Sequence, residues 1–119
     1  MNNFIISIDG TAGSGKARIA KYISKKYKLY HLDSGILYRR IVKFLLDKKV
    51  DYTNKIELKK YLKNTKTISS RSHKILRTEK ISKYSSKVAK IPIIREFVNQ
   101  QQRTIVKNKL KIYHGCVID

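Results

Sequence analysis

The fold is decided by the stretch Phe4-Ile5-Ile6-Ser7-Ile8-Asp9-Gly10-Thr11-Ala12-Gly13-Ser14-Gly15-Lys16. Large apolar residues lead into a glycine-rich loop, and a predicted helix follows the lysine, with Ile19, Ala20, Ile23 and Tyr27 at helical spacing on its inner face. This order is typical of a phosphate-binding loop, which has the pattern Gly-x4-Gly-Lys between a strand and a helix. Because glycine has no Cβ, the glycines at 10, 13 and 15 let backbone N–H groups turn toward phosphate oxygens.

The residues that follow the glycines complete a phosphate site with one departure from the pattern. The start of the helix contributes a partial positive charge, and Lys16 adds a full and mobile one. Position 17 normally carries Ser or Thr for Mg²⁺, whereas this chain has Ala17. The alternative interpretation is a glycine-rich turn before an amphipathic helix. The predicted phosphate-binding residues are Gly10, Thr11, Ala12, Gly13, Ser14, Gly15, Lys16 and Ala17.

The charge of the chain is strongly positive. Its 119 residues include 28 Lys and Arg against 8 Asp and Glu, which gives a formal net charge of +20. Such a charge favours a polyanionic partner, either nucleic acid or nucleotide phosphates. The competing explanation is the codon bias of an AT-rich genome, because lysines dominate over arginines and are spread along the whole chain. We therefore expect no specific nucleic-acid partner.

Several classes of protein are disfavoured by the composition. No apolar run is long enough to span a membrane, and the first residues lack the pattern of a signal peptide. The single cysteine, Cys116, excludes an internal disulfide framework and a cysteine-based zinc site. His31, His73 and His114 are scattered without ligand spacing, so no protein-bound metal site is predicted. We expect a cytoplasmic monomer with no membrane partner.

The apolar spacing predicts strands that alternate with helices. Strands are expected over residues 4–8, 29–32 and 111–119, and helices over 16–28, 36–48, 54–62, 78–89 and 93–107. Asn54 and Thr78 are predicted helix caps, and Pro92 suits the first turn of the last helix. Residues 63–74 are polar and aperiodic, which indicates a loop or a weak strand. This alternation predicts an α/β fold with a parallel sheet.

The last strand ends at Asp119 with no turn after it. In a parallel sheet, the residue after a strand lies at the edge where ligands bind. Three strands would also make a thin sheet with an exposed edge. We therefore expect the chain to be the N-terminal part of a longer protein, truncated after about its third strand.

Four ordered stretches resemble the bacterial cytidylate kinases, which are nucleoside monophosphate kinases of the P-loop type. The resemblance implies a single incomplete P-loop kinase domain over residues 1–119, with about residues 50–92 as the monophosphate-binding insertion region. The final Val117-Ile118-Asp119 is similar to the start of the family's Asp-Gly-Arg-Asp segment. The four stretches are Ile8 to Lys16, Leu32-Asp33-Ser34-Gly35-Ile36-Leu37-Tyr38-Arg39, Leu76 to Glu79 with Tyr84 to Ala89, and Ile91 to Glu96 with Gln102-Arg103.

The resemblance implies transfer of a phosphoryl group from ATP to CMP or dCMP. The loop would hold the ATP phosphates, while Ser34, Tyr38 and Arg39 would hold the phosphate of the acceptor. Ser86 and Arg95 match family positions that read cytosine, and Asp119 would lie near Mg²⁺ and the transferring phosphate. The implied catalytic residues are Lys16, Arg39 and Asp119, and the implied cofactors are ATP and Mg²⁺.

Three departures from the family's pattern accompany this resemblance. Ala17 and Arg18 stand where the family and its relatives place a Ser or Thr, residues 63–77 form a shorter insertion, and the segments after Asp119 are absent. Three alternatives stay open. The chain could be a basic nucleic-acid-binding module without catalysis, another nucleoside monophosphate kinase, or a remnant without function.

Overall fold

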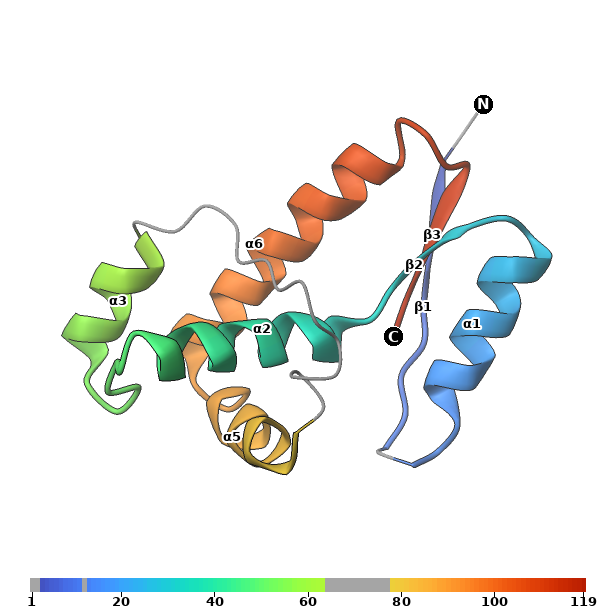
Figure 1. Cartoon of the computed structure of the whole chain (residues 1–119). Helices are drawn as coiled ribbons and strands as arrows, with labels where there is room; N and C mark the ends of the chain where they lie inside the picture. The colour runs from blue at the N-terminus through green and yellow to red at the C-terminus, as the bar shows by residue number, and fades with distance from the viewer. Residues whose placement is uncertain (1–2, 12, 64–77) are drawn as a thin grey trace. The chain divides into compact units, whose positions relative to one another are not determined.

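A computed structural model describes residues 3–11, 13–63 and 78–119 of the chain (Figure 1). The chain divides into two compact units. The first contains Met1–Ser34 and Gln102–Asp119, and the second contains Gly35–Gln101. The predicted insertion region, about residues 50–92, falls inside the second unit and stays a prediction as a functional domain.

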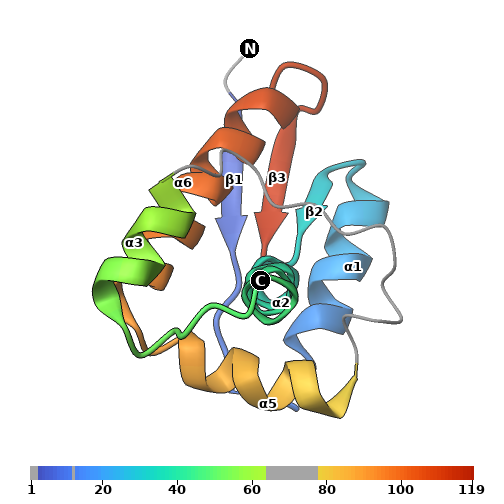
Figure 2. The ribbon, with the colours of Figure 1, turned by 60° about the vertical axis from the view of Figure 1, so that its left-hand side comes forward.

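The first unit contains a parallel sheet of three strands in the order β1-β3-β2. They are β1 (Phe4–Ser7), β2 (Tyr30–Leu32) and β3 (Gly115–Ile118). Figure 2 shows the three strands side by side, with the last strand of the sequence between the first two. In register, Ile5 lies opposite Cys116, and His31 lies opposite Val117. The predicted α/β fold with a parallel sheet is confirmed.

The central position of β3 explains its composition. Gly115, Cys116 and Val117 are all buried, as expected for a strand with a neighbour on each side. Burial also raises the pKa of the Cys116 thiol, because a low-dielectric surrounding disfavours the thiolate. By contrast, β1 lies at the edge, and its Ile5 is 51% exposed.

One helix, α1 (Lys16–Lys26), connects β1 to β2 and packs against the sheet. Ala20 is fully buried in a core cluster with Leu29 and Val117. The predicted inner face of this helix was partly wrong, because Ile19 is 51% exposed and Tyr27 is 60% exposed. The helix instead approaches through the small side chains of Ala20 and Ser24, which lie one turn apart. Ile19 is rotated about 100° away from this contact.

The second unit is helical. It contains most of α2 (Ser34–Asp47), α3 (Lys55–Lys63), α5 (Glu79–Val88) and the first half of α6 (Pro92–Lys109) (Figure 1). Its buried apolar side chains are Leu37, Ile41, Val42, Leu45, Val50, Leu58, Leu62, Ile81, Val88, Ile94 and Val98.

The predicted caps at Asn54 and Thr78 and the predicted place of Pro92 are confirmed. The Asn54 Oδ1 accepts from the backbone N–H groups of Ile56 and Glu57, at 3.1 and 3.2 Å. The Thr78 Oγ1 accepts from Ile81 N at 3.4 Å, and Pro92 is the first residue of α6. Beyond Lys63, which ends α3, the loop or weak strand predicted over residues 63–74 lies outside the described residues.

No helix in the described part of the chain is long and apolar enough to cross a membrane.

The buried centre of β3 should dominate the stability of the first unit. Val117 is fully buried, so Val117→Ala should lower the free energy of unfolding by about 1–3 kcal/mol through lost burial and a residual cavity. Ile5→Ala removes more atoms from the half-exposed edge and should cost less, about 1 kcal/mol. Urea denaturation followed by circular dichroism measures both. Equal losses would contradict the central position of β3.

The buried thiol should be protected in the folded state. Cys116 should react slowly with a thiol-specific disulfide reagent in buffer and quickly in urea. Its raised folded pKa means that the unfolded state loses the thiol proton first, so stability should fall as pH rises through the ordinary thiol pKa of about 9.0. Cys116→Ala should remove this alkaline decline. Rapid labelling of folded protein at neutral pH would disprove this placement.

Candidate nucleotide-binding site

The loop between β1 and α1 has the backbone geometry of an anion cradle. Gly13 and Gly15 have φ angles of 79° and 88°, in the left-handed region that other residues adopt only with strain. Ser14 N donates to Thr11 O at 3.1 Å, which closes a turn ahead of the helix. Residue 12, predicted as part of this loop, lies outside the described residues.

The start of α1 offers donors without a competing acceptor. Gly15 occupies the cap position without a side-chain hydrogen bond, and the first turn of the helix carries no acidic residue. A depression of about 520 Å³ lies along this turn. Unpaired N–H groups and the two cationic residues of its lining favour an anion there. The depression is lined by Gly13, Ser14, Gly15, Lys16, Ala17 and Arg18.

Asp119 is held in place by its backbone. Its N–H donates to Leu32 O at 3.1 Å, and its carbonyl accepts from Ser34 N at 3.0 Å. The Ser34 hydroxyl also donates to this carbonyl, at 2.5 Å. Ser34 is a predicted acceptor-phosphate ligand, and a role as donor to that phosphate would require its hydroxyl to rotate away from Asp119.

The side chain of Asp119 has a partner that the sequence analysis did not identify. His31 Nε2 lies 2.5 Å from Asp119 Oδ1, and the two side chains are 26% and 2% exposed. A carboxylate that is ionised can only accept, so this bond then requires the proton to be on the imidazole Nε2. His31 pairs with Val117 in register, and Asp119 is two residues further along, so both side chains lie on one face of the sheet.

The other predicted residues belong to the second unit. Tyr38 and Arg39 lie in the first turns of α2 and are half-buried. On α5, Ser86 is exposed, and its hydroxyl donates back to Ser82 O at 3.3 Å. Arg95 is exposed in the first turn of α6. The loop, Ser34 and Asp119 belong to the first unit, whereas Tyr38, Arg39, Ser86 and Arg95 belong to the second.

A further arginine of α2, Arg40, has a buried polar atom. The Arg40 Nε is buried, and it has no hydrogen-bond partner among the described residues. A buried donor without a partner carries a desolvation cost. In the sequence, only its position next to the predicted phosphate ligand Arg39 marks Arg40 as a candidate functional residue.

No group of three His, Cys, Asp or Glu side chains that could hold a metal ion occurs within residues 3–11, 13–63 and 78–119.

The bond between His31 and Asp119 should stabilise the carboxyl edge of the sheet. His31→Ala leaves a carboxylate that is 2% exposed without its donor, so the free energy of unfolding should fall by about 1–3 kcal/mol. His31→Gln keeps an N–H donor and should recover part of this loss. Urea denaturation at neutral pH gives the comparison.

The exposed pair of Lys43 and Asp47, with Nζ and Oδ2 2.7 Å apart, provides a matched control. Lys43→Ala should change the free energy of unfolding by about 0.5 kcal/mol or less, because water screens such pairs. If both alanine variants unfold at the same urea concentration, the bond between His31 and Asp119 stabilises the fold no more than the exposed Lys43–Asp47 pair does.

Comparison with known proteins identifies relatives of the chain. A model of the cytidylate kinase family matches residues 6–118. The chain is 37% identical over 125 residues to a cytidylate kinase of Fusobacterium nucleatum subsp. nucleatum, a match that covers 97% of this chain and 57% of that protein. Identity is 32% over 119 residues to a cytidylate kinase of Bartonella quintana, with 100% and 53% covered.

A third relative combines two named activities. It is a bifunctional pantoate ligase/cytidylate kinase of Prochlorococcus marinus subsp. pastoris, 39% identical over 116 residues, with 85% of this chain and 22% of that protein covered. The chain spans a little over half the length of the cytidylate kinases that it matches, 57% and 53%. Because the family match extends over nearly all of its residues, the chain belongs to the cytidylate kinase family.

Proposed function

We propose that the chain takes part in phosphoryl transfer from ATP to CMP or dCMP, which gives ADP and CDP or dCDP. The observation that carries this proposal is the left-handed glycine loop before α1, in a chain that belongs to the cytidylate kinase family. Phosphoryl transfer needs little covalent chemistry from the protein, because alignment and neutralisation of charge supply most of the acceleration.

The donor nucleotide binds at the loop in this proposal. Residues 10–17 surround the ATP phosphates, and the N–H groups at the start of α1 donate to their oxygens. Lys16 neutralises charge on the β- and γ-phosphates as the bond to the leaving ADP lengthens. Asp119, at the end of the central strand, is the proposed carboxylate nearest the transferring group.

In this proposal, residues of the second unit contact the acceptor nucleotide, and Ser34, of the first unit, stays a predicted ligand of its phosphate. Arg39 offers a planar guanidinium that can clamp phosphate oxygens with two parallel hydrogen bonds, and Tyr38 adds a hydroxyl. Ser86 and Arg95 are the proposed contacts to cytosine, and residues 50–92 are the proposed insertion that carries them. Both side chains are exposed and therefore accessible to a ligand.

A Mg²⁺ ion is part of the proposal, but neither position 17 nor the Asp119 side chain offers it a free ligand. Ala17 has a methyl group where a hydroxyl would bind, and the Asp119 side chain is 2% exposed and bonded to His31. Mg²⁺ retains water readily and often binds through substrate phosphates. When bound, it would neutralise charge on the transferring phosphate, held by nucleotide oxygens and water.

Removing the lysine of the loop tests the ATP site. Lys16→Ala should weaken ATP binding by about 1.5–3 kcal/mol, the range for a hydrogen bond to a charged group. Isothermal titration of the chain with ATP measures the change. Lys25→Ala, at an exposed position on the same helix, is the control and should leave the affinity unchanged. If both variants bind ATP as the unchanged chain does, the loop assignment is wrong.

Substrate selectivity tests the acceptor site. With ATP present, CMP should bind the chain more tightly than UMP, and Arg95→Ala should reduce this difference by lowering the affinity for CMP. The exposed Arg103 is the control position, and Arg103→Ala should leave the selectivity intact. Equal affinity for CMP and UMP in the unchanged chain would reject the cytidylate assignment.

A further inference from the structure

The outward face of α3 is basic. Leu58 and Leu62 are buried on its inner side, at 0% and 5% exposure. On the opposite side, Lys59, Lys60 and Lys63 are exposed. They surround Ile56, which is 83% exposed and is the most exposed large apolar residue of the described chain. Helical periodicity places these four residues on one face.

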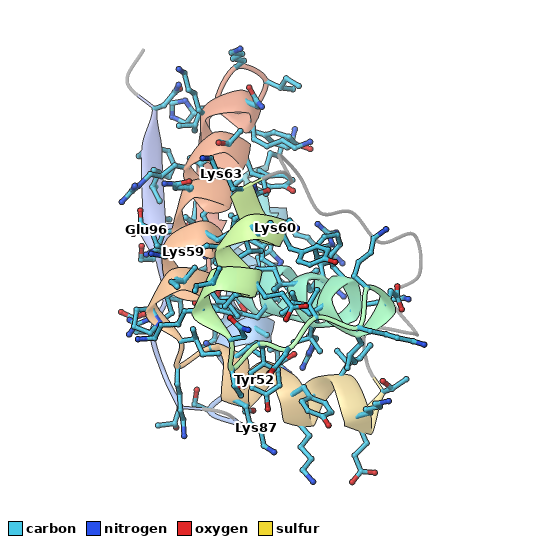
Figure 3. All side chains as sticks on the ribbon, turned by 90° about the vertical axis from the view of Figure 1, so that its left-hand side faces the viewer. Tyr52, Lys59, Lys60, Lys63, Lys87 and Glu96 are labelled. Carbon is cyan, nitrogen blue, oxygen red and sulfur yellow. The ribbon has the colours of Figure 1, made fainter. Side chains whose placement is uncertain are left out.

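The aromatic residue that precedes α3 connects this face to α5. Figure 3 shows Lys63, Lys60 and Lys59 along α3, with Tyr52 between them and Lys87 of α5 in this view. The rings of Tyr52 and Tyr84 meet edge to face, with centroids 6.1 Å apart. Lys87 Nζ lies 5.5 Å from the centre of the Tyr84 ring. Two half-buried tyrosines therefore lie among the lysines of two helices.

The exposed side of α5 extends the positive charge. A depression of about 420 Å³ follows this helix. Three of its five lining residues are lysines on neighbouring turns, and a fourth is Tyr84. The lining residues are Glu79, Lys80, Lys83, Tyr84 and Lys87. We call the surface formed by Tyr52, Ile56, Lys59, Lys60, Lys63, Lys80, Lys83, Tyr84 and Lys87 the basic face.

Among the described residues, no carboxylate forms an ion pair with a lysine of the basic face. Over these residues, the one lysine that pairs with a carboxylate is Lys43, on α2. Three glutamates lie on the same helices or beside them: Glu57 is half-buried on α3, Glu79 lines the depression along α5, and the Glu96 carboxylate accepts from Gln100 Nε2 at 3.5 Å. Six like charges on two short helices repel one another unless an anion binds.

We propose that the basic face binds single-stranded nucleic acid without sequence preference. Lysines suit this ligand because a flexible ammonium follows a phosphate backbone as a point charge and reads no base edges. The tyrosines and the exposed Ile56 supply the apolar and aromatic surface on which unpaired bases stack. In a duplex the bases are already stacked, so only the phosphates would gain contacts. The proposal does not depend on the kinase reaction.

Binding of a fluorescein-labelled 16-residue oligothymidylate to the chain tests this proposal by fluorescence anisotropy. The triple variant Lys59→Gln, Lys60→Gln, Lys63→Gln should weaken binding at least ten-fold at 100 mM salt. The slope of log affinity against log salt concentration should fall by about 2, because each lost phosphate contact contributes about 0.7 for single strands.

A second triple variant separates the basic face from the net charge. Lys21→Gln, Lys25→Gln, Lys26→Gln removes the same charge from exposed positions on α1 in the first unit and should change the affinity less than three-fold. Equal weakening by the two triples would show that the overall charge, not this face, holds the strand, and would overturn the proposal. Circular dichroism checks that each variant is folded.

Two further measurements identify the ligand and the site. Tyr52→Leu should weaken oligothymidylate binding about five-fold or more and leave binding of inorganic polyphosphate unchanged. A duplex of the same length should bind more weakly than the single strand, and ATP at matched ionic strength should not displace the strand. Preference for the duplex, an unchanged affinity in Tyr52→Leu, or displacement by ATP would each reject the basic face as a single-strand site.

Discussion

The strand β3 pairs with both other strands, and the hydrogen bonds at its end hold the carboxyl edge of the sheet together. On one side Ile8 N donates to Ile118 O at 2.9 Å, and on the other Asp119 N donates to Leu32 O at 3.1 Å. The glycine loop begins just after Ile8, and α2 begins just after Leu32 and Asp33. A strand that lies more than eighty residues further along the chain therefore fixes the points at which these two segments leave the sheet. At the same edge, the buried Asp119 carboxylate bonds to His31.

The two proposed phosphate-binding surfaces depend on different physics. In the loop before α1, left-handed glycines and the helix start orient backbone N–H groups, a geometry that suits a compact anion. On α3 and α5, exposed lysines carry the charge on flexible side chains. That arrangement suits an extended polyanion, because each ammonium can follow its own phosphate and the bound chain does not have to adopt one fixed conformation.

Local features were predictable because their causes are local. The glycine loop, the caps at Asn54 and Thr78 and the place of Pro92 each depend on residues within one turn of each other. The inner face of α1 was partly wrong, because apolar spacing alone ranks Ile19 above Ser24. Close packing against the sheet reverses this ranking, since small side chains let the helix approach. The predicted roles of Tyr38, Arg39, Ser86 and Arg95 stay predictions.

By itself the sequence determined the class of fold, the position of the glycine loop between the first strand and the first helix, and the alternation of strands and helices, because these follow from residue type, spacing and backbone preference. Tertiary structure decided the strand order β1-β3-β2 and, through it, the partnership of His31 and Asp119, 88 residues apart. It also brought Tyr52, which precedes α3, against Tyr84 of α5. Spacing along a chain carries no signal for such neighbours, since hydrogen bonding between strands and packing between helices bring distant segments together.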